Sequence, residues 1–168
     1  FGTGRQWSSS NRVLNQVFGG WQVNTIGMMQ TGLPLVVRGA SNFLADRPNS
    51  TGQSAKLENR TAARWFDTTE FVNPPNFTWG NVPRALPDVR TPGTVNWDLS
   101  FLKSARFGER LGLQFRAEAF NFLNHVSLRE PNATFVPGTD GRNRSGSFGV
   151  ITGSRDARVI QFGLKLLF

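Results

Sequence analysis

The chain is 168 residues long, 38% of its residues are hydrophobic, and its formal net charge at pH 7 is +8. It has no cysteine, which excludes disulfides and thiolate metal sites, and its one histidine, His125, cannot form a histidine cluster, so we expect neither a metal nor a cofactor. The positive charge is spread along the chain rather than gathered on one element, which argues against nucleic acid as a partner.

The composition favours an all-β protein. Eighteen glycines and nine prolines point to turns and long loops, while β-branched and aromatic residues come in short bursts. No stretch of about 18 apolar residues is present, which excludes a transmembrane helix but not strands that cross a membrane. The hydrophobic share is low for a globular domain, so any core should be lean.

The first predicted strand covers residues 21–30. Its alternation of apolar and polar residues is imperfect, because Ile26 and Met28 share the parity of Gln22 and Asn24. Polar and apolar side chains are therefore expected on one face of this strand.

A long loop is predicted over residues 31–94, which are rich in Pro, Asn, Gly, Thr and Arg and have little periodicity. It carries acidic residues such as Asp67, Glu70 and Asp88 without a recognisable catalytic pairing, and no glycine-rich phosphate loop follows a strand. With a single histidine available as a general base, we expect no enzymatic activity.

A β-hairpin is predicted next. Residues 95–106 and 111–123 alternate between apolar and polar, and they are joined through a turn around Gly108. A helix is the alternative for the second run, since Ala, Glu, Leu and Arg are good helix formers, but its apolar residues do not recur at intervals of three and four. In a barrel wall, the polar side chains of this hairpin would face the lumen: Asn96, Asp98, Gln114, Arg116 and Glu118.

These five polar residues have two interpretations. They form contacts to a substrate or to a plug, or they form a network on the inner wall in which the charged and polar groups are hydrogen-bonded to one another. The network is the more frequent arrangement, because polar groups away from water are normally hydrogen-bonded.

A second long loop, residues 125–154, precedes a final strand over residues 157–168. In that strand Gln161, Gly163 and Lys165 alternate with apolar residues, so one face is apolar and the other would face a lumen. The apolar positions are Ile160, Phe162, Leu164, Leu166 and Phe168.

The order of strands and loops predicts the fold class. One tight turn and two long loops match outer-membrane barrels, whose periplasmic turns are short and whose extracellular loops are long. We therefore expect antiparallel strands of a transmembrane β-barrel, with the Gly108 turn in the periplasm. About four strands cannot close a barrel, for which about eight is the practical minimum, so the partners are remaining barrel strands or other copies of the chain.

Two other architectures stay open. A soluble secreted β-domain that binds a ligand through its loops would also have alternating strands, with the polar face in water, and would be extracellular. A structural protein would use its open strand edges to assemble into an oligomer or a filament.

Five Asn-X-Ser/Thr triplets lie in the predicted long loops. They would be glycosylation acceptors in a eukaryotic secreted protein, whereas loops rich in Asn and Thr contain such triplets by chance. The triplets begin at Asn49, Asn59, Asn76, Asn132 and Asn143.

Four stretches carry a family resemblance: FGTGRQW, GGWQVNTIGMMQTGLPLVV, FRAEAFNFLNH and FGVITGSRDARVIQFGLKLLF. They resemble the last strands of TonB-dependent outer-membrane receptors, especially the Oar-like group with a carboxypeptidase-regulatory-like N-terminal domain. The strongest elements are Arg116 to His125 and Arg158 to Phe168. The resemblance implies a C-terminal segment, residues 1–168, of a plugged barrel of about 22 strands in the bacterial outer membrane.

The resemblance also implies a function and its partners. Such receptors take up a large or scarce nutrient, or bind it at the surface, with energy from a periplasmic energy-transducing complex. Outer-membrane lipid surrounds the barrel, and the barrel-assembly machinery reads the last strand. The residues that match this assembly signal by position are Ile160, Phe162, Leu164, Leu166 and Phe168.

The sequence also departs from the family pattern. It contains no plug, no TonB-box and no tyrosine, although tyrosine is usual in the interfacial girdles of such barrels. Trp21, Trp97 and the phenylalanines would have to replace it.

Overall fold

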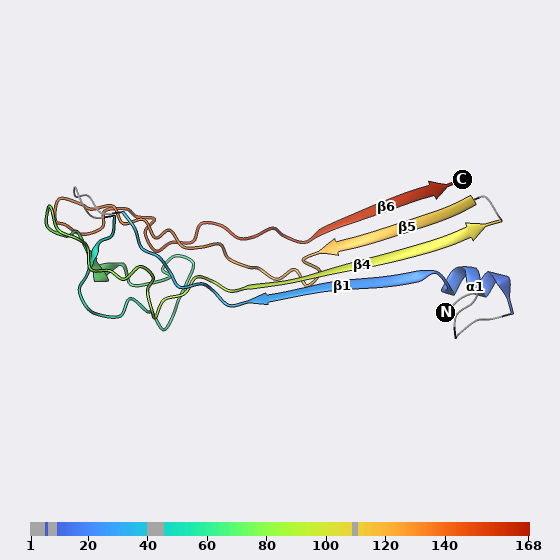
Figure 1. Ribbon diagram of the computed structural model, residues 1–168, viewed down its shortest axis with the longest axis horizontal. Coiled ribbons are helices and arrows are strands. Elements are labelled where there is room, and N and C mark those ends of the chain that lie inside the picture. The colour runs from blue at the N-terminus through green and yellow to red at the C-terminus, as the bar shows by residue number, and fades with distance from the viewer. Residues whose placement is uncertain (1–5, 7–9, 40–45, 109–110) are drawn as a thin grey trace. The chain divides into compact units, whose positions relative to one another are not determined.

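The computed structural model describes residue 6 and residues 10–39, 46–108 and 111–168 (Figure 1). These residues belong to two compact units, which we name the strand unit and the loop unit. The strand unit comprises Phe1–Met29, Val95–His125 and Asp156–Phe168, and the loop unit comprises Gln30–Thr94 and Val126–Arg155.

The strand unit carries a four-stranded antiparallel sheet, which confirms the predicted fold class. Its strands lie in the order β1-β4-β5-β6, and neighbouring arrows point in opposite directions (Figure 1). Within the described residues the sheet is open, with β1 and β6 at its edges. The strands are β1 (Trp21–Gln30), β4 (Thr94–Phe107), β5 (Leu111–Phe120) and β6 (Val159–Leu167).

β4 and β5 form the hairpin that the alternation predicts. Phe107 pairs with Leu111 across the connection. Gly108 begins the connection with a φ of 71°, a left-handed conformation that glycine adopts without strain. Residues 109–110 of the predicted turn lie outside the described part of the chain.

β5 ends at Phe120, so the predicted end at residue 123 is wrong. Asn121 and Asn124 both have left-handed φ values, 48° and 51°, which end a strand and which asparagine tolerates better than most residues. The side chain of Asn121 fixes the turn: its Oδ1 accepts from the His125 amide at 3.0 Å, and its Nδ2 donates to the His125 carbonyl at 3.1 Å.

β6 begins at Val159 rather than at residue 157, and the same turn explains why. The β5–β6 ladder stops at the pair of Phe120 with Val159. Before that pair, the carbonyl of Asp156 accepts from Asn121 Nδ2 at 3.3 Å. The residues that precede Val159 therefore bond to the side chains of the turn instead of to a strand.

One helix, α1 (Arg12–Phe18), was not predicted and precedes β1. Asn11 caps it by accepting from two amides of the first turn. Gly19 follows the last residue of the helix as its C-cap, and Gly20 then passes so close to β4 that a Cβ there would lie 2.2 Å from the Ser104 carbonyl oxygen. Among the described residues, no helix has the length and apolar character needed to cross a membrane.

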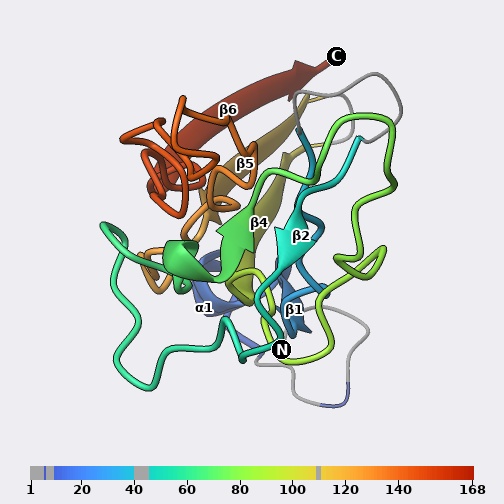
Figure 2. The same cartoon turned by 90° about the vertical axis from the view of Figure 1, so that its left-hand side faces the viewer.

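The loop unit consists mostly of irregular coil, which Figure 2 shows around β2. It comprises most of the two predicted long loops, 31–94 and 125–154. Its short elements are β2 (Asn49–Ser50), η1 (Thr68–Glu70) and β3 (Phe71–Val72), and β2 pairs antiparallel with β3.

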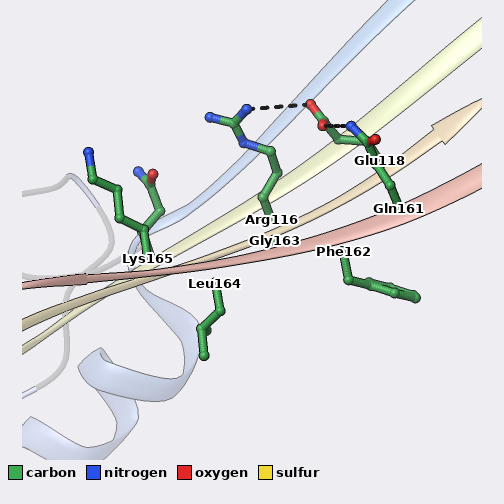
Figure 3. A pocket seen from close by; sticks show the side chains of 8 residues that line it. Arg116, Glu118, Gln161, Phe162, Gly163, Leu164 and Lys165 are labelled. Atoms are coloured by element: carbon green, nitrogen blue, oxygen red, sulfur yellow. Dashed lines mark hydrogen bonds and ion pairs between the residues drawn. The ribbon is translucent and has the colours of Figure 1, made fainter.

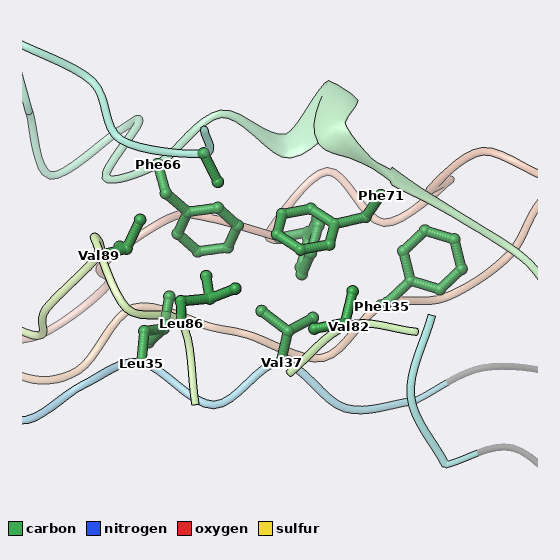
Figure 4. Packing of buried hydrophobic residues seen from close by; sticks show 10 residues of the cluster. Leu35, Val37, Phe66, Phe71, Val82, Leu86, Val89 and Phe135 are labelled. Atoms are coloured by element: carbon green, nitrogen blue, oxygen red, sulfur yellow. The ribbon is translucent and has the colours of Figure 1, made fainter. Parts of the chain in front are cut away.

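Both segments of the loop unit share one hydrophobic core (Figure 4). Phe148 of the second segment packs edge-to-face against Phe66, Phe71 and Phe135, with ring centroids 5.1, 5.6 and 6.0 Å away. This is the arrangement that aromatic quadrupoles favour. The buried members of the core are Leu35, Val37, Ala55, Phe66, Phe71, Val82, Leu86, Val89, Phe135 and Phe148.

Backbone hydrogen bonds join the same two segments. The Trp65 amide donates to the Gly149 carbonyl at 2.8 Å, and the Phe135 amide donates to the Arg38 carbonyl at 2.7 Å. The predicted loops thus fold as one unit, with buried side chains in a region whose sequence shows little periodicity.

Candidate functional site: the polar face of the sheet

The register of the sheet sorts its side chains into two faces. Directly paired residues of antiparallel strands point to the same side, and Ser100, Glu118 and Gln161 are such a set across β4, β5 and β6. We name this side the polar face: it holds even-numbered residues of β4 and β5 and odd-numbered residues of β6. The opposite positions form the apolar face.

β1 follows the same division, with its odd-numbered residues on the apolar face. A Cβ on Gly27 would lie 2.9 Å from the Trp97 ring, and Lys103 Nζ lies 5.3 Å from the centroid of the Trp21 ring. Both contacts place odd positions of β1 beside odd positions of β4. Ile26 and Met28 therefore share the polar face, which explains the imperfect alternation of this strand.

Glu118 is the centre of a group of polar side chains on the polar face (Figure 3). It accepts a hydrogen bond from Gln161 Nε2 at 2.6 Å and from Ser100 Oγ at 3.4 Å, and its Oε1 lies 3.9 Å from Arg116 Nη1. The group spans three strands. Because the Arg116 side chain is half exposed, its ion pair with Glu118 contributes little to stability as it stands.

A glycine gives the Arg116 side chain its space. Gly163 of β6 is paired with Arg116, so the position beside the guanidinium carries no side chain. Gln114 is paired with Lys165 one step along the ladder. An open recess above Gly163 results, with the polar side chains on one side of the strands and Phe162 and Leu164 pointing to the other (Figure 3).

Asn96 and Asp98, the other two predicted residues, form a second group on the polar face. Asn96 Nδ2 donates to Asp98 Oδ1 at 2.9 Å, and the same carboxylate oxygen accepts from the Asn121 amide at 2.9 Å. Asp98 thus helps to hold the turn that ends β5. Sequence reasoning missed this role, although an asparagine directly after an alternating run is a signal for such a turn.

The buried polar side chains of the described residues are hydrogen-bonded. Across the described residues, every buried side-chain nitrogen or oxygen has a hydrogen-bond partner. The same residues contain no cluster of three or more His, Asp or Glu side chains that would hold a metal ion.

Three acidic residues of the loop unit accept hydrogen bonds from neighbouring hydroxyl groups. Asp88 accepts from Ser54, and Glu70 accepts from Thr51. Asp67 accepts from the amide and hydroxyl of Thr69 at 3.1 and 2.8 Å. Burial acts to raise the pKa of Asp67, but the bonds from Thr69 and the Arg64 guanidinium outweigh it and hold the pKa below 3.8.

The apolar face is exposed along β1 and β6 and at least partly exposed along most of β4 and β5. Phe115 and Phe162 stack on it with ring centroids 6.2 Å apart and planes at 16°. A contiguous apolar surface of this kind needs a cover other than water. The predicted assembly residues on it are Ile160, Phe162, Leu164, Leu166 and Phe168, with exposed fractions of 56, 72, 67, 57 and 105%.

A comparison with known families identifies that cover. A family model for an outer membrane beta barrel domain matches residues 1–161. No curated protein matches the chain, and no solved structure does. The family supports location in the outer membrane rather than outside the cell. The chain belongs to the outer membrane beta barrel domain family.

Proposed function

We propose that this chain is a C-terminal wall segment of a TonB-dependent, Oar-like receptor, with its polar face toward the lumen and its apolar face toward lipid. One observation carries the orientation: all four strands keep most of their apolar side chains on one face, which is exposed along both edge strands. In the bilayer that face meets acyl chains, and the hydrogen-bonded polar face lines water. The receptor class is supported by the resemblance of the four sequence stretches.

The strand directions support a matching orientation across the membrane. The Gly108 connection lies at one end of the β4–β5 hairpin, and the loop unit joins β1, β4, β5 and β6 at their other ends in chain order. Barrels have short turns in the periplasm and long loops outside. We therefore assign Gly108 to the periplasm and the loop unit to the cell surface, where a nutrient would first be met.

On the lumenal side, we assign Arg116, Glu118 and Gln161 to a structural network of the wall. Glu118 accepts hydrogen bonds from Gln161 of β6 and from Ser100 of β4, so the network ties β4, β5 and β6 together. The Arg116 guanidinium is the member that extends into the recess above Gly163 (Figure 3). It is the side chain of this network best placed to meet a plug or a passing anionic group.

β6 has a further proposed role as the segment that the barrel-assembly machinery recognises. Its apolar residues are all exposed, from 48% at Leu167 to 72% at Phe162, and β6 is an edge strand of the sheet. An edge strand offers unpaired backbone groups to another strand. The next barrel strand would occupy that edge in the closed receptor.

The mass of the native particle in detergent tests the proposal. A receptor segment should be found within a polypeptide much longer than this chain. An outer-membrane extract in which the chain occurs only as multiples of 18.6 kDa would contradict the proposal. Energy dependence is the second readout: nutrient uptake by the intact receptor should stop when the periplasmic energy-transducing complex is deleted.

A second candidate function is assembly of several chains through β1 and β6. The observation that favours it is the open sheet, whose two edge strands are exposed at every position. Several copies would then supply the strands of one shared barrel or of a filament. The same mass measurement separates the two candidates, since only assembly of copies gives a ladder of multiples.

A further inference from the structure

We propose that α1 lies in the periplasmic leaflet of the outer membrane, beside the barrel wall. This inference rests on the proposed function, since it takes the apolar face of the sheet as the surface that meets lipid. The four apolar residues of the helix are spaced so that they all lie on one side of it. They are Val13, Leu14, Val17 and Phe18, with exposed fractions of 68, 42, 53 and 59%.

The helix is tied to the apolar face by a lysine. Lys103 is paired with Phe115, so its side chain leaves β4 on the apolar face. Its ammonium donates to the carbonyls of Gln16 at 2.6 Å, Val17 at 3.0 Å and Gly19. All three carbonyls belong to the end of α1, where a helix has carbonyls without an intrahelical partner.

This arrangement gives hydrogen-bond partners to the Lys103 ammonium and to the carbonyls at the end of α1, which are polar groups that would be costly to place in a membrane without partners. An unpaired ammonium and an unpaired backbone carbonyl are both costly away from water. Lys103 has three donors and meets three acceptors, and its positive charge lies at the negative end of the helix dipole. The pairing explains how a lysine is accommodated on a face that is otherwise apolar.

Trp21 makes a second attachment on the same face. Its Nε1 donates to the Val17 carbonyl at 3.0 Å, and its ring lies below the Lys103 ammonium. Tryptophan prefers the boundary between acyl chains and head groups, because its ring is apolar and its N–H is polar. Gln16 adds a bond from its Nε2 to the Arg106 carbonyl at 2.7 Å, near the Gly108 end of β4.

Lipid is the occupant that fits the apolar side of α1. The side chains that anchor the helix come from the face that we assign to the bilayer, and this face continues to the same end of the sheet. There Phe107 and Leu166 are 50% and 57% exposed. A helix of seven residues is too short to be stable alone in water, so it depends on its bonds to the sheet and on the surface that covers its apolar side.

Spin labels on single cysteines test this placement in the receptor as its gene encodes it. The chain itself has no cysteine, so labels at Val17→Cys, Asn15→Cys and Phe162→Cys report three defined sites. The receptor is reconstituted in phosphatidylethanolamine–phosphatidylglycerol vesicles. Each label is then exposed to oxygen, which concentrates in lipid, and to a nickel complex, which stays in water.

We expect the label at position 17 to match the one at position 162, with oxygen access above nickel access. The label at position 15, on the polar side of α1, should show the reverse ratio. Nickel access at position 17 together with oxygen access at position 162 would overturn the inference and leave the barrel orientation intact. Nickel access at both positions would instead contradict the proposed function.

Substitutions of Lys103, which ties α1 to the sheet, can be compared with a matched substitution of Lys165. Lys103→Met removes the three donors and should shift the label at position 17 toward nickel access, while Lys103→Arg should keep it lipid-facing. Lys165→Met is the control, because Lys165 lies on the polar face and should leave the ratio unchanged. An equal shift in Lys103→Met and Lys165→Met would show that Lys103 does not anchor the helix. If Lys103→Met fails to fold, the label at position 17 in the otherwise unchanged receptor still decides whether α1 meets lipid.

Discussion

The two units distribute hydrophobic residues in opposite ways. The strand unit has regular secondary structure but leaves its large apolar side chains exposed, as at Phe162 and Leu164. The loop unit has almost no regular secondary structure but buries rings such as Phe66 and Phe71 almost completely. The difference indicates two solvents: a bilayer covers the first set of side chains, and the protein itself covers the second.

The largest effect is expected from removing the aromatic ring at the centre of the hydrophobic core of the loop unit. Phe148→Ala deletes the edge-to-face contacts with Phe66, Phe71 and Phe135, and it should cost about 3–5 kcal/mol of stability in the loop unit. Hydrogen exchange should rise throughout the loop unit and stay low in the membrane-embedded strands.

Trp79→Ala is the matched control for that change, since Trp79 is an aromatic residue of the same unit and is 70% exposed. It should alter stability by less than about 0.5 kcal/mol. Equal effects of the two substitutions would mean that the loop unit has no packed core.

A charge placed on each face of the sheet tests the other half of the comparison. Leu164→Arg puts a guanidinium on the apolar face and should cost about 2–4 kcal/mol if that position lies near the bilayer midplane. Ser104→Arg puts the same group on the polar face and should cost much less. Urea titration of the receptor in vesicles measures both. A larger loss for Ser104→Arg would reverse our assignment of the faces.

A smaller effect is expected within the polar network. Replacing Arg116 by Met should cost about 0.2–1 kcal/mol, because its ion pair with Glu118 is long and half exposed. Glu118→Leu should cost more, since it leaves Gln161 without its acceptor. A double-mutant cycle measures the coupling, and a coupling energy of several kcal/mol would show that the pair is much stronger than its exposure indicates.

The smallest effect concerns pH. The pKa of Asp67 lies below 3.8 in the folded chain, so its carboxylate stabilises the loop unit above the unfolded pKa. That contribution should be lost as pH falls through the folded pKa. Thermal unfolding of the loop unit should become less pH-dependent below about pH 4 in Asp67→Asn. An unchanged acid profile in this variant would assign the acid sensitivity to other groups.

The strands were predictable because each one lies between two environments. Positions such as Gln114 and Phe115 alternate in the sequence because their side chains point to opposite faces. The same rule assigned Arg116 and Glu118 to one face, and the register adds that Gly163 and Gln161 lie directly beside them. The register, which decides which residues of two strands lie side by side, cannot be derived from the sequence of one strand alone.

The core of the loop unit and the contacts of α1 could not be predicted, because no regular spacing of residues in the sequence indicates them. Phe66 and Phe148 meet in the core although many residues separate them, and irregular coil imposes no spacing on such contacts. α1 has an asparagine cap and two terminal glycines, but seven residues are too few to show helical periodicity. Lys103 occupies an odd-numbered position of β4 among apolar residues, and its partners on α1 are visible only in the structure.

Labelling along β5 tests the assignment of the two faces of the sheet. Single cysteines at positions 113–118 of the receptor in vesicles are treated with a water-soluble maleimide. Positions 114, 116 and 118 should react, and positions 113, 115 and 117 should not. Uniform reaction along the strand, or reaction at the odd positions only, would contradict a wall with its polar face toward water and its apolar face toward lipid.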